Sequence, residues 1–179
     1  SFLLMAWLGC FSLVWAQKGG ITSVEVPASE RSLLVLPPLD NDQLLAEEMA
    51  RRAPGVAPRF AHTFSVRITP ATHGSWQPLD AQTEVWRYRI RSQGALSLNL
   101  GFSLFEMPYG GELYLKSTDS GEAFGPFTPA DNESHQQLWT PLLQGDELIV
   151  EVRLPLGRRR ELGLHLTHIN HDFLGFAQA

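Results

Sequence analysis

The stretch EVWRYRIRSQGALSLNLGF, residues 84–102, decides the fold class of this chain. Its first half alternates the apolar residues Trp86, Tyr88 and Ile90 with arginines, and its second half alternates leucine with serine and asparagine. Successive side chains of a β-strand point to opposite sides of a sheet, so a period of two predicts strands with one buried and one wet face. Gly94 marks a turn between the two strands. The pattern is typical of antiparallel sheet.

Further runs with a period of two lie on both sides of this stretch. Glycine, proline and aspartate separate them as turns. About seven short strands at this spacing predict an all-β fold, an antiparallel β-sandwich for which a jelly roll is one candidate topology. We expect this domain over residues 60–176. The runs are HTFSVRITP (62–70), ELYLKS (112–117), QLWTPLL (137–143), DELIVEVRLP (146–155) and ELGLHLTHI (161–169).

The residues before the sandwich predict one short helix. In DNDQLLAEEMARRA, residues 40–53, acidic side chains come early and arginines late, as the helix dipole favours. Leucine, methionine and alanine give the segment an apolar stripe, and Pro54 ends it. We therefore expect an N-terminal segment over residues 17–59, with the helix at about residues 42–53.

The first residues, 1–16, predict a signal peptide. No charge stands between Ser1 and Lys18, and the apolar run has the length of a signal-peptide core. The basic start of such a signal is missing, as expected of a signal truncated at its N-terminus. Small residues at Val14 and Ala16 favour cleavage after Ala16. We expect a secreted, periplasmic or cell-surface protein that meets the membrane only transiently, through this signal.

Two other interpretations of the N-terminus stay open. The tetrapeptide WLGC, which ends at Cys10, faintly resembles a lipoprotein cleavage site, and the apolar run could instead be a buried helix. Cys10 is the only cysteine of the chain, so cleavage after Ala16 would leave a mature protein without a disulfide.

The charge balance argues against a nucleic-acid partner. The net charge is −5, whereas nucleic-acid binding needs a basic stripe. The only basic cluster, residues 158–160, lies between two predicted strands and is interpreted as a solvated turn. No motif points to a cofactor, and we expect none.

Motifs of catalysis are absent from the sequence. A Ser–His–Asp set is spatial and stays open, but no Gly-x-Ser-x-Gly elbow occurs. Glu147 and Glu151 would lie about 13 Å apart on a strand, too far for a catalytic carboxylate pair, and are interpreted as a solvated face. The loop TPADNESHQQ, residues 128–137, lacks the glycine of a calcium loop. We expect no catalytic residue in this chain.

The stretch HLTHINHDFLGF, residues 165–176, carries three histidines at intervals of three. With a period of two, His165 points outward and His168 toward the core, while His171 lies at or past the end of the strand. Histidines on opposite faces cannot bind one ion without a β-bulge. No metal site is therefore predicted here.

The aromatic residues leave a binding role open. Trp86 alternates with the apolar residues of its strand and is expected in the core. Trp76 and Trp139 lack such a context. If their rings are exposed, they are candidates for stacking on the apolar faces of a carbohydrate.

Several segments, in this order, resemble one known family. They resemble the N-terminal pro-region of secreted bacterial trypsin-like serine endopeptidases similar to lysyl endopeptidase. The resemblance covers roughly residues 33–176, because the helix-bearing segment before the sandwich is also similar to the start of such pro-regions. The segments are GSWQPL (74–79), the run over 84–117, the turn in FGPFT (124–128), QLWTPLLQGDELIVEVRLP (137–155) and HINHDFLGF (168–176).

The resemblance implies a non-catalytic pro-region that follows a signal peptide and precedes a peptidase domain. Its expected role is to assist the folding of that domain, to hold it inactive, or both. The chain ends at Ala179, where the peptidase domain of the family would begin, so no catalytic residue carries over to this sequence. The implied partner is the peptidase domain of the same precursor. The alternative is a carbohydrate- or cell-surface-binding module attached to a secreted hydrolase.

Overall fold

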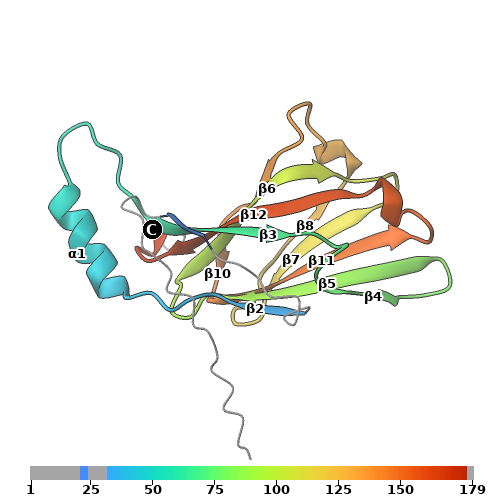
Figure 1. Cartoon of the computed structure of the whole chain (residues 1–179), viewed down its shortest axis with the longest axis horizontal. Coiled ribbons are helices and arrows are strands. Elements are labelled where there is room, and N and C mark those ends of the chain that lie inside the picture. The colour runs from blue at the N-terminus through green and yellow to red at the C-terminus, as the bar shows by residue number, and fades with distance from the viewer. Residues whose placement is uncertain (1–20, 24–31, 177–179) are drawn as a thin grey trace, which may run out of the picture.

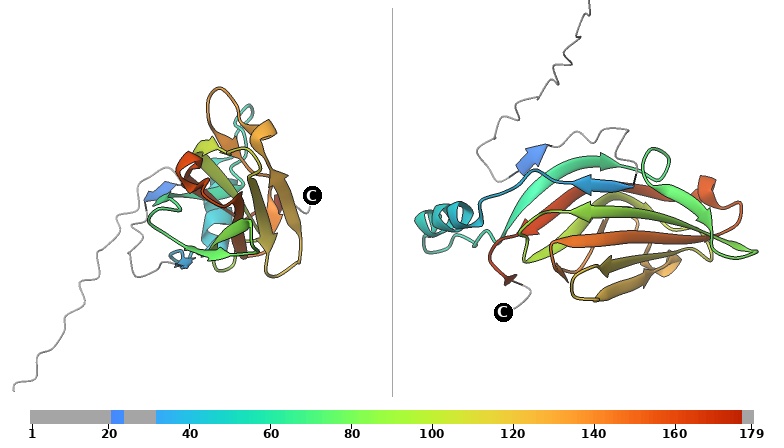
Figure 2. Two further views of the ribbon diagram at one scale, coloured as in Figure 1. Left: turned by 90° about the vertical axis from the view of Figure 1, so that its right-hand side faces the viewer. Right: turned by 90° about the horizontal axis from the view of Figure 1, so that it is seen from below.

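The computed structural model describes residues 21–23 and 32–176, which form two β-sheets and one α-helix. The sheets lie face to face as a sandwich, and the helix stands at one end of it (Figures 1 and 2). The elements are β1 (Ile21–Ser23), β2 (Leu33–Val35), α1 (Asn41–Arg51), β3 (Ala61–Ile68), β4 (Ser75–Pro78), β5 (Thr83–Arg91), β6 (Ser97–Glu106), β7 (Glu112–Ser117), β8 (Ala123–Phe127), η1 (Pro129–Asp131), β9 (Leu138–Trp139), β10 (Leu143–Gln144), β11 (Glu147–Pro155), η2 (Arg159–Glu161) and β12 (Gly163–Asp172).

The strand pairing is that of a jelly roll. Sheet A has the order β1-β3-β12-β6-β10, with β9 also on β6, and sheet B has the order β2-β5-β11-β7-β8, with β4 also on β5. When β1, β2, β4 and β9 are set aside, the remaining strands form antiparallel pairs that are nested in the sequence, the first strand with the last. These pairs are β3 with β12, β5 with β11, β6 with β10, and β7 with β8. A long hairpin rolled across two sheets gives this order. The predicted antiparallel sandwich is therefore confirmed, in its jelly-roll form.

The core lies between the two sheets and follows the period of two. On β5, Trp86, Tyr88 and Ile90 are at most 2% exposed, as predicted. The inward leucines and valines of β11, from Leu148 to Leu154, are equally buried. Each fully buried side chain of this size contributes about 1.5–3 kcal/mol, so these two central strands of sheet B anchor the fold.

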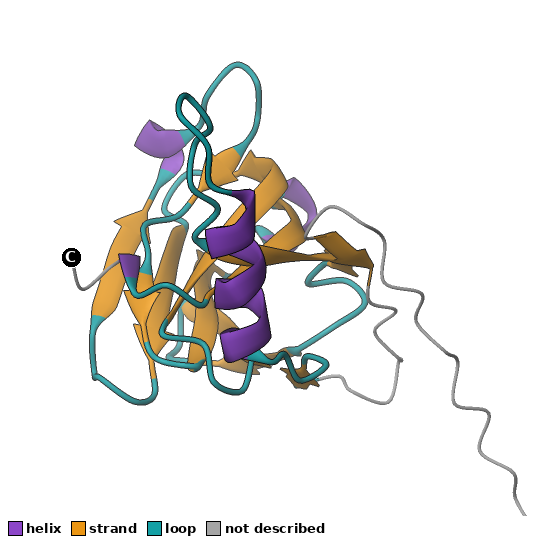
Figure 3. Cartoon of the chain, turned by 90° about the vertical axis from the view of Figure 1, so that its left-hand side faces the viewer, coloured by secondary structure: helices purple, strands orange, loops and turns teal. Residues whose placement is uncertain are grey.

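The helix α1 closes one end of the sandwich (Figure 3). Its N-cap is Asp40, whose carboxylate accepts a hydrogen bond from the amide of Gln43 at 3.0 Å. Leu44 is buried, whereas Met49 on another side is 63% exposed. The helix ends at Arg51, slightly before the expected residue 53, because the backbone of Arg52 is already extended ahead of Pro54.

Short strands before α1 extend one edge of each sheet. The strand β1 joins β3 in parallel, and β2 joins β5 in parallel on the same edge that β4 occupies further along. The N-terminal segment thus completes the sandwich in addition to carrying the helix.

Two segments differ from the sequence-based prediction. The run QLWTPLL forms two strands, β9 and β10, because Pro141 interrupts the ladder. Residues 124–127 of the segment FGPFT belong to strand β8 and do not form a turn. Gly125 makes this possible with a φ of 118°, at a point where a Cβ atom would lie 2.5 Å from the carbonyl oxygen of Leu113. In the part of the chain that the structure describes, no helix is long and apolar enough to cross a membrane.

Candidate functional site

A β-bulge in β12 decides which way its histidines point. The register of β12 to β3 and to β6 shifts between Leu166 and His168, which leaves Thr167 as the extra residue. Before the bulge Leu164 and Leu166 face the core, and after it Ile169 and His171 do. The extra residue therefore reverses the alternation in the second half of the strand.

The prediction that His168 points toward the core is therefore wrong. Its ring lies on the outer face of sheet A, the side turned away from the core, with its centroid 5.5 Å from that of Trp139. His165 is exposed, and His171 is fully buried at the end of the strand. A strictly alternating strand would have given the opposite orientation to His168. The β-bulge supplies the reason for the difference.

His171 joins the helix to the sandwich through buried hydrogen bonds. Its Nδ1 lies 2.7 Å from the hydroxyl of Ser92, and its Nε2 lies 2.9 Å from Oδ1 of Asn41, the first residue of α1. The amide nitrogen of Asn41 donates in turn to the carbonyl of Gly94 at 2.7 Å. Because the amide oxygen only accepts, Nε2 carries the proton and Nδ1 accepts from Ser92. The imidazole is thus neutral and held from both sides.

Burial, with a smaller contribution from the neighbouring His62, lowers the pKa of His171 to about 4. The Ser92–His171–Asn41 arrangement has the residue types of a nucleophile, a base and an orienting amide. Ser92 is 1% exposed and His171 is 0% exposed, so no substrate can approach them. These residues hold α1 in place, and they do not form an accessible active site.

Asp172 fixes the path of the chain as it leaves the sandwich. Its fully buried carboxylate accepts hydrogen bonds from the hydroxyl of Ser97 and from the amides of residues 174–176, at 2.7–2.9 Å. Phe176 then packs on Phe60 with ring centroids 5.0 Å apart. The last described residues therefore lie beside the loop that joins α1 to β3.

The same loop is tied to the helix by Glu48. This carboxylate is 1% exposed and accepts from the Arg51 guanidinium at 2.8 Å and from the Arg59 amide at 3.0 Å. Desolvation raises the pKa of Glu48, but these hydrogen bonds outweigh it, so the pKa lies below its ordinary value. Arg51 also donates to the carbonyl of Ala57. We call α1, the loop 52–60 and the turn 173–176 the exit end.

Paired charges cover the outer face of sheet B. Glu151 on the central strand β11 accepts from Arg87 at 2.7 Å, from Lys116 at 2.9 Å and from Arg153 at 2.9 Å. Desolvation raises the pKa of Glu151, but the three cations prevail and hold it at about 2. The guanidinium of Arg153 also lies 4.7 Å from the centre of the Tyr114 ring.

The interpretation of Glu147 and Glu151 as a solvated face is wrong in one respect. Both lie on the outer face of sheet B, but they are 8% and 2% exposed because basic side chains cover them. Arg89 binds Glu147 on this face, whereas Arg159 binds Glu84, which lies opposite Leu154 on the core side of the sheet. Each of these buried carboxylates is therefore paired with a cation.

The two candidate binding tryptophans have different surroundings. Trp76 on β4 is half-buried against the core, and the guanidinium of Arg159 lies 4.7 Å above its ring. Trp139 on β9 is 53% exposed on the outer face of sheet A. The proposed cleavage position, Ala16, lies outside the described residues. Among the residues that the structure describes, no group of three His, Cys, Asp or Glu side chains could hold a metal ion.

One family model matches the chain. Its description is "Lysyl endopeptidase N-terminal domain", and the match covers residues 35–172. These limits are the last residue of β2 and the last residue of β12, so the match contains α1 and the complete jelly roll.

Proposed function

The chain belongs to the lysyl endopeptidase N-terminal domain family, and on this basis we propose that it is the non-catalytic pro-region of a secreted serine endopeptidase precursor. In this proposal the sandwich assists the folding of the peptidase domain, inhibits it, or does both. The observation that carries the proposal is the family match over α1 and the strands from β3 to β12. The burial of Ser92 and His171 supports a non-catalytic role.

The proposed partner is the peptidase domain of the same precursor, which is trypsin-like in this proposal. The carboxylate of Asp172 orders the turn that leaves β12, and the rings of Phe176 and Phe60 bring this turn to the exit end. A domain that follows this turn would emerge beside α1. We therefore expect the peptidase to contact the exit end first.

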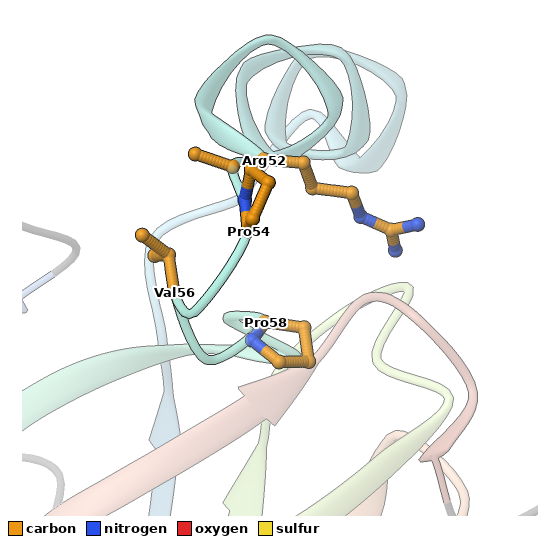
Figure 4. A pocket seen from close by; sticks show the side chains of 5 residues that line it. Arg52, Pro54, Val56 and Pro58 are labelled. Atoms are coloured by element: carbon orange, nitrogen blue, oxygen red, sulfur yellow. The ribbon is translucent and has the colours of Figure 1, made fainter.

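The exit end has the surface that such a contact needs. Met49 and Val56 are 63% and 47% exposed, which is high for apolar side chains. Figure 4 shows an open pocket in the loop after α1, and its lining residues are Arg52, Ala53, Pro54, Val56 and Pro58. Apart from Arg52, the residues that line this pocket are apolar. Protein interfaces combine an apolar centre with a polar rim, so this composition fits contact with a folded domain.

The mechanism follows from binding linkage. A rigid sandwich that binds the folded peptidase, but not the unfolded chain, stabilises the folded state in proportion to its occupancy. The buried links of His171 and Glu48 keep α1 and its loop in one position, so that little entropy is lost when the partner binds. If the bound surface also covers the substrate cleft, the same contact inhibits the enzyme.

Export is the second part of the proposal. The apolar run over residues 1–16 supports a signal peptide with cleavage after Ala16, which would deliver the precursor outside the cytoplasm. N-terminal sequencing of the exported precursor tests this point. A sequence that begins at Gln17 supports the proposal, whereas an uncleaved N-terminus or a lipidated Cys10 contradicts it.

The inhibition proposal is tested by adding the purified chain to an active lysyl endopeptidase and following hydrolysis of a chromogenic lysyl amide. Activity should fall as the chain is added, and Met49→Glu or Val56→Asp should weaken the effect. Leu156→Asp is the matched control, because this 54% exposed leucine follows β11 at the other end of the sandwich. Equal inhibition by all four proteins would contradict docking through the exit end.

A further inference from the structure

The indole of Trp139 lies over Gly101 on the outer face of sheet A. Trp139 pairs with Gly101 of β6, and a Cβ atom on this glycine would come within 2.5 Å of the six-membered ring. Glycine inside a strand often marks such a close approach. The ring rests on the sheet on one side, and the residue is 53% exposed.

His168 extends this platform across the next strand. Gly101 also pairs with His168 of β12, so the two rings meet over the glycine. The hydroxyl of Thr167 donates to the carbonyl of Gly101 at 3.3 Å and lies 3.0 Å from Nδ1 of His168. Since this hydroxyl donates its single proton to the carbonyl, Nδ1 is the donor to its oxygen. The lone pair on Nε2 is then available to a ligand hydroxyl.

In the rows of His168 and Asn170, the side chains beside the platform are polar and uncharged. Asn170 pairs with Asn99 on one side and with Thr63 on the other, and the Thr63 hydroxyl donates to Oδ1 of Asn170 at 2.6 Å. In the part of the chain that the structure describes, the amide nitrogen of Asn170 has no hydrogen-bond acceptor. Ser65 pairs with His168 in the adjacent row. These two rows therefore present hydroxyl, amide and imidazole groups beside one exposed aromatic ring.

This composition differs from that of the other sheet. On the outer face of sheet B, cations and carboxylates satisfy one another. Trp76 lies on the core side of that sheet, opposite Trp86, and the guanidinium of Arg159 covers its ring. A protein partner would also need a larger apolar centre than a single indole. A flat ring amid neutral donors and acceptors instead suits a ligand with an apolar C–H face and a rim of hydroxyls.

We propose that the Trp139–His168 platform is a binding site for a neutral saccharide. The apolar face of one sugar ring stacks on the indole of Trp139, while its hydroxyls bond to Nε2 of His168 and the amide of Asn170. A single platform of this kind gives weak binding, with a dissociation constant of roughly 0.1–1 mM. This activity stands apart from the pro-region role and does not depend on it.

Calorimetric titration of the chain tests the proposal, with hexasaccharides of β-1,4-linked glucose, N-acetylglucosamine, xylose and mannose as probes up to about 10 mM. At least one probe should bind. Trp139→Ala should weaken its binding by about tenfold or more, and Trp139→Phe should retain part of it. Tyr109→Ala is the matched control, since this residue is an 82% exposed aromatic in the turn between β6 and β7. It should bind like the parent chain.

Three results would overturn the saccharide site. The first is that none of the four probes binds. The second is that Trp139→Ala binds as tightly as the parent chain while circular dichroism shows the same fold. The third is that Trp139→Ala weakens inhibition of a lysyl endopeptidase without changing saccharide binding, which would assign this face to the protein partner.

Discussion

The rings of Trp139 and His168 meet across the backbone of Gly101, with their centroids 5.5 Å apart on the outer face of sheet A. His168 reaches this face because the β-bulge at Thr167 reverses the alternation of β12. The same extra residue turns His171 into the core, where it binds Ser92 and Asn41. One irregularity thus creates both an exposed ring pair and a buried link to α1.

Gly101→Ala should lift the indole off the sheet. The new methyl group would lie within 2.5 Å of the Trp139 ring, but this ring is half-exposed and can rotate away. We therefore expect a stability loss of about 1 kcal/mol, at the low end for overpacking. The fluorescence of Trp139, obtained by subtracting the spectrum of Trp139→Ala, should shift to longer wavelength. An unchanged spectrum would show that the indole does not rest on Gly101.

His171→Ala should destabilise the fold by about 2–3 kcal/mol, because it leaves the buried hydroxyl of Ser92 unsatisfied and removes the hydrogen bond to Asn41. Urea unfolding measures the change, and hydrogen exchange should show faster opening of α1. His165→Ala on the same strand is the control, since His165 is exposed and its loss should cost less than about 0.5 kcal/mol. Equal effects of the two substitutions would contradict the role given to His171.

Acid should destabilise the sandwich in two separate pH ranges. The pKa of His171 is about 4 in the folded protein and 6.5 in the unfolded chain, so the unfolded state binds the proton more tightly. Stability should therefore fall as the pH drops from 6.5 to 4. His62, Asp172 and Asp146 also face this ring, and the two aspartates oppose the shift without reversing it.

The second range belongs to Glu151, whose pKa falls from 4.5 to about 2 on folding. Its contribution is complete above pH 4.5 and is lost as the pH approaches 2. Urea unfolding at a series of pH values measures both ranges. His171→Gln should flatten the first range and leave the second one intact. A first range that persists in this variant would assign the acid sensitivity to another group.

Glu151→Gln should cost about 2 kcal/mol, measured by urea unfolding. The substitution keeps the shape of the side chain but leaves Arg87, Lys116 and Arg153 without their common anion. These cations are partly exposed and can turn toward water, so the loss lies below that of a fully buried pair. Glu161→Gln is the control, because its ion pair with Arg158 is exposed on both sides and should contribute less than about 0.5 kcal/mol. If Glu151→Gln lowered the free energy of unfolding no more than Glu161→Gln does, the ion pairs of Glu151 would not stabilise the fold.

The sheets of this protein could be predicted because the core follows a simple period. Residues such as Tyr88 and Val150 alternate with charged neighbours, and the cross-strand pairs of β5 and β11 bury them as expected. The helix could be predicted equally well, because its N-cap, its charge distribution and the proline after it are local sequence signals. Features that depend on residues close together in the sequence could therefore be predicted.

The β-bulge and the long-range contacts could not be predicted from the sequence in the same way. Two polar residues in succession, Thr167 and His168, interrupt the apolar alternation of β12, and this break is the signal that could have revealed the bulge. Gly101 within a strand was the corresponding signal for a ring lying on the sheet. The bond from Asn41 to His171 joins residues 130 positions apart, and no local pattern encodes it.

The most direct test of the pro-region proposal is the refolding of a denatured lysyl endopeptidase domain with and without this chain. The recovered activity is measured after the complex is dissociated, so that inhibition does not hide refolded enzyme. The proposal predicts either a higher yield of active enzyme in the presence of the chain or, before dissociation, inhibition that follows its concentration, and Met49→Glu should weaken either effect. Equal yields with and without the chain, together with no inhibition at any concentration, would contradict the proposal that the sandwich acts on a peptidase domain.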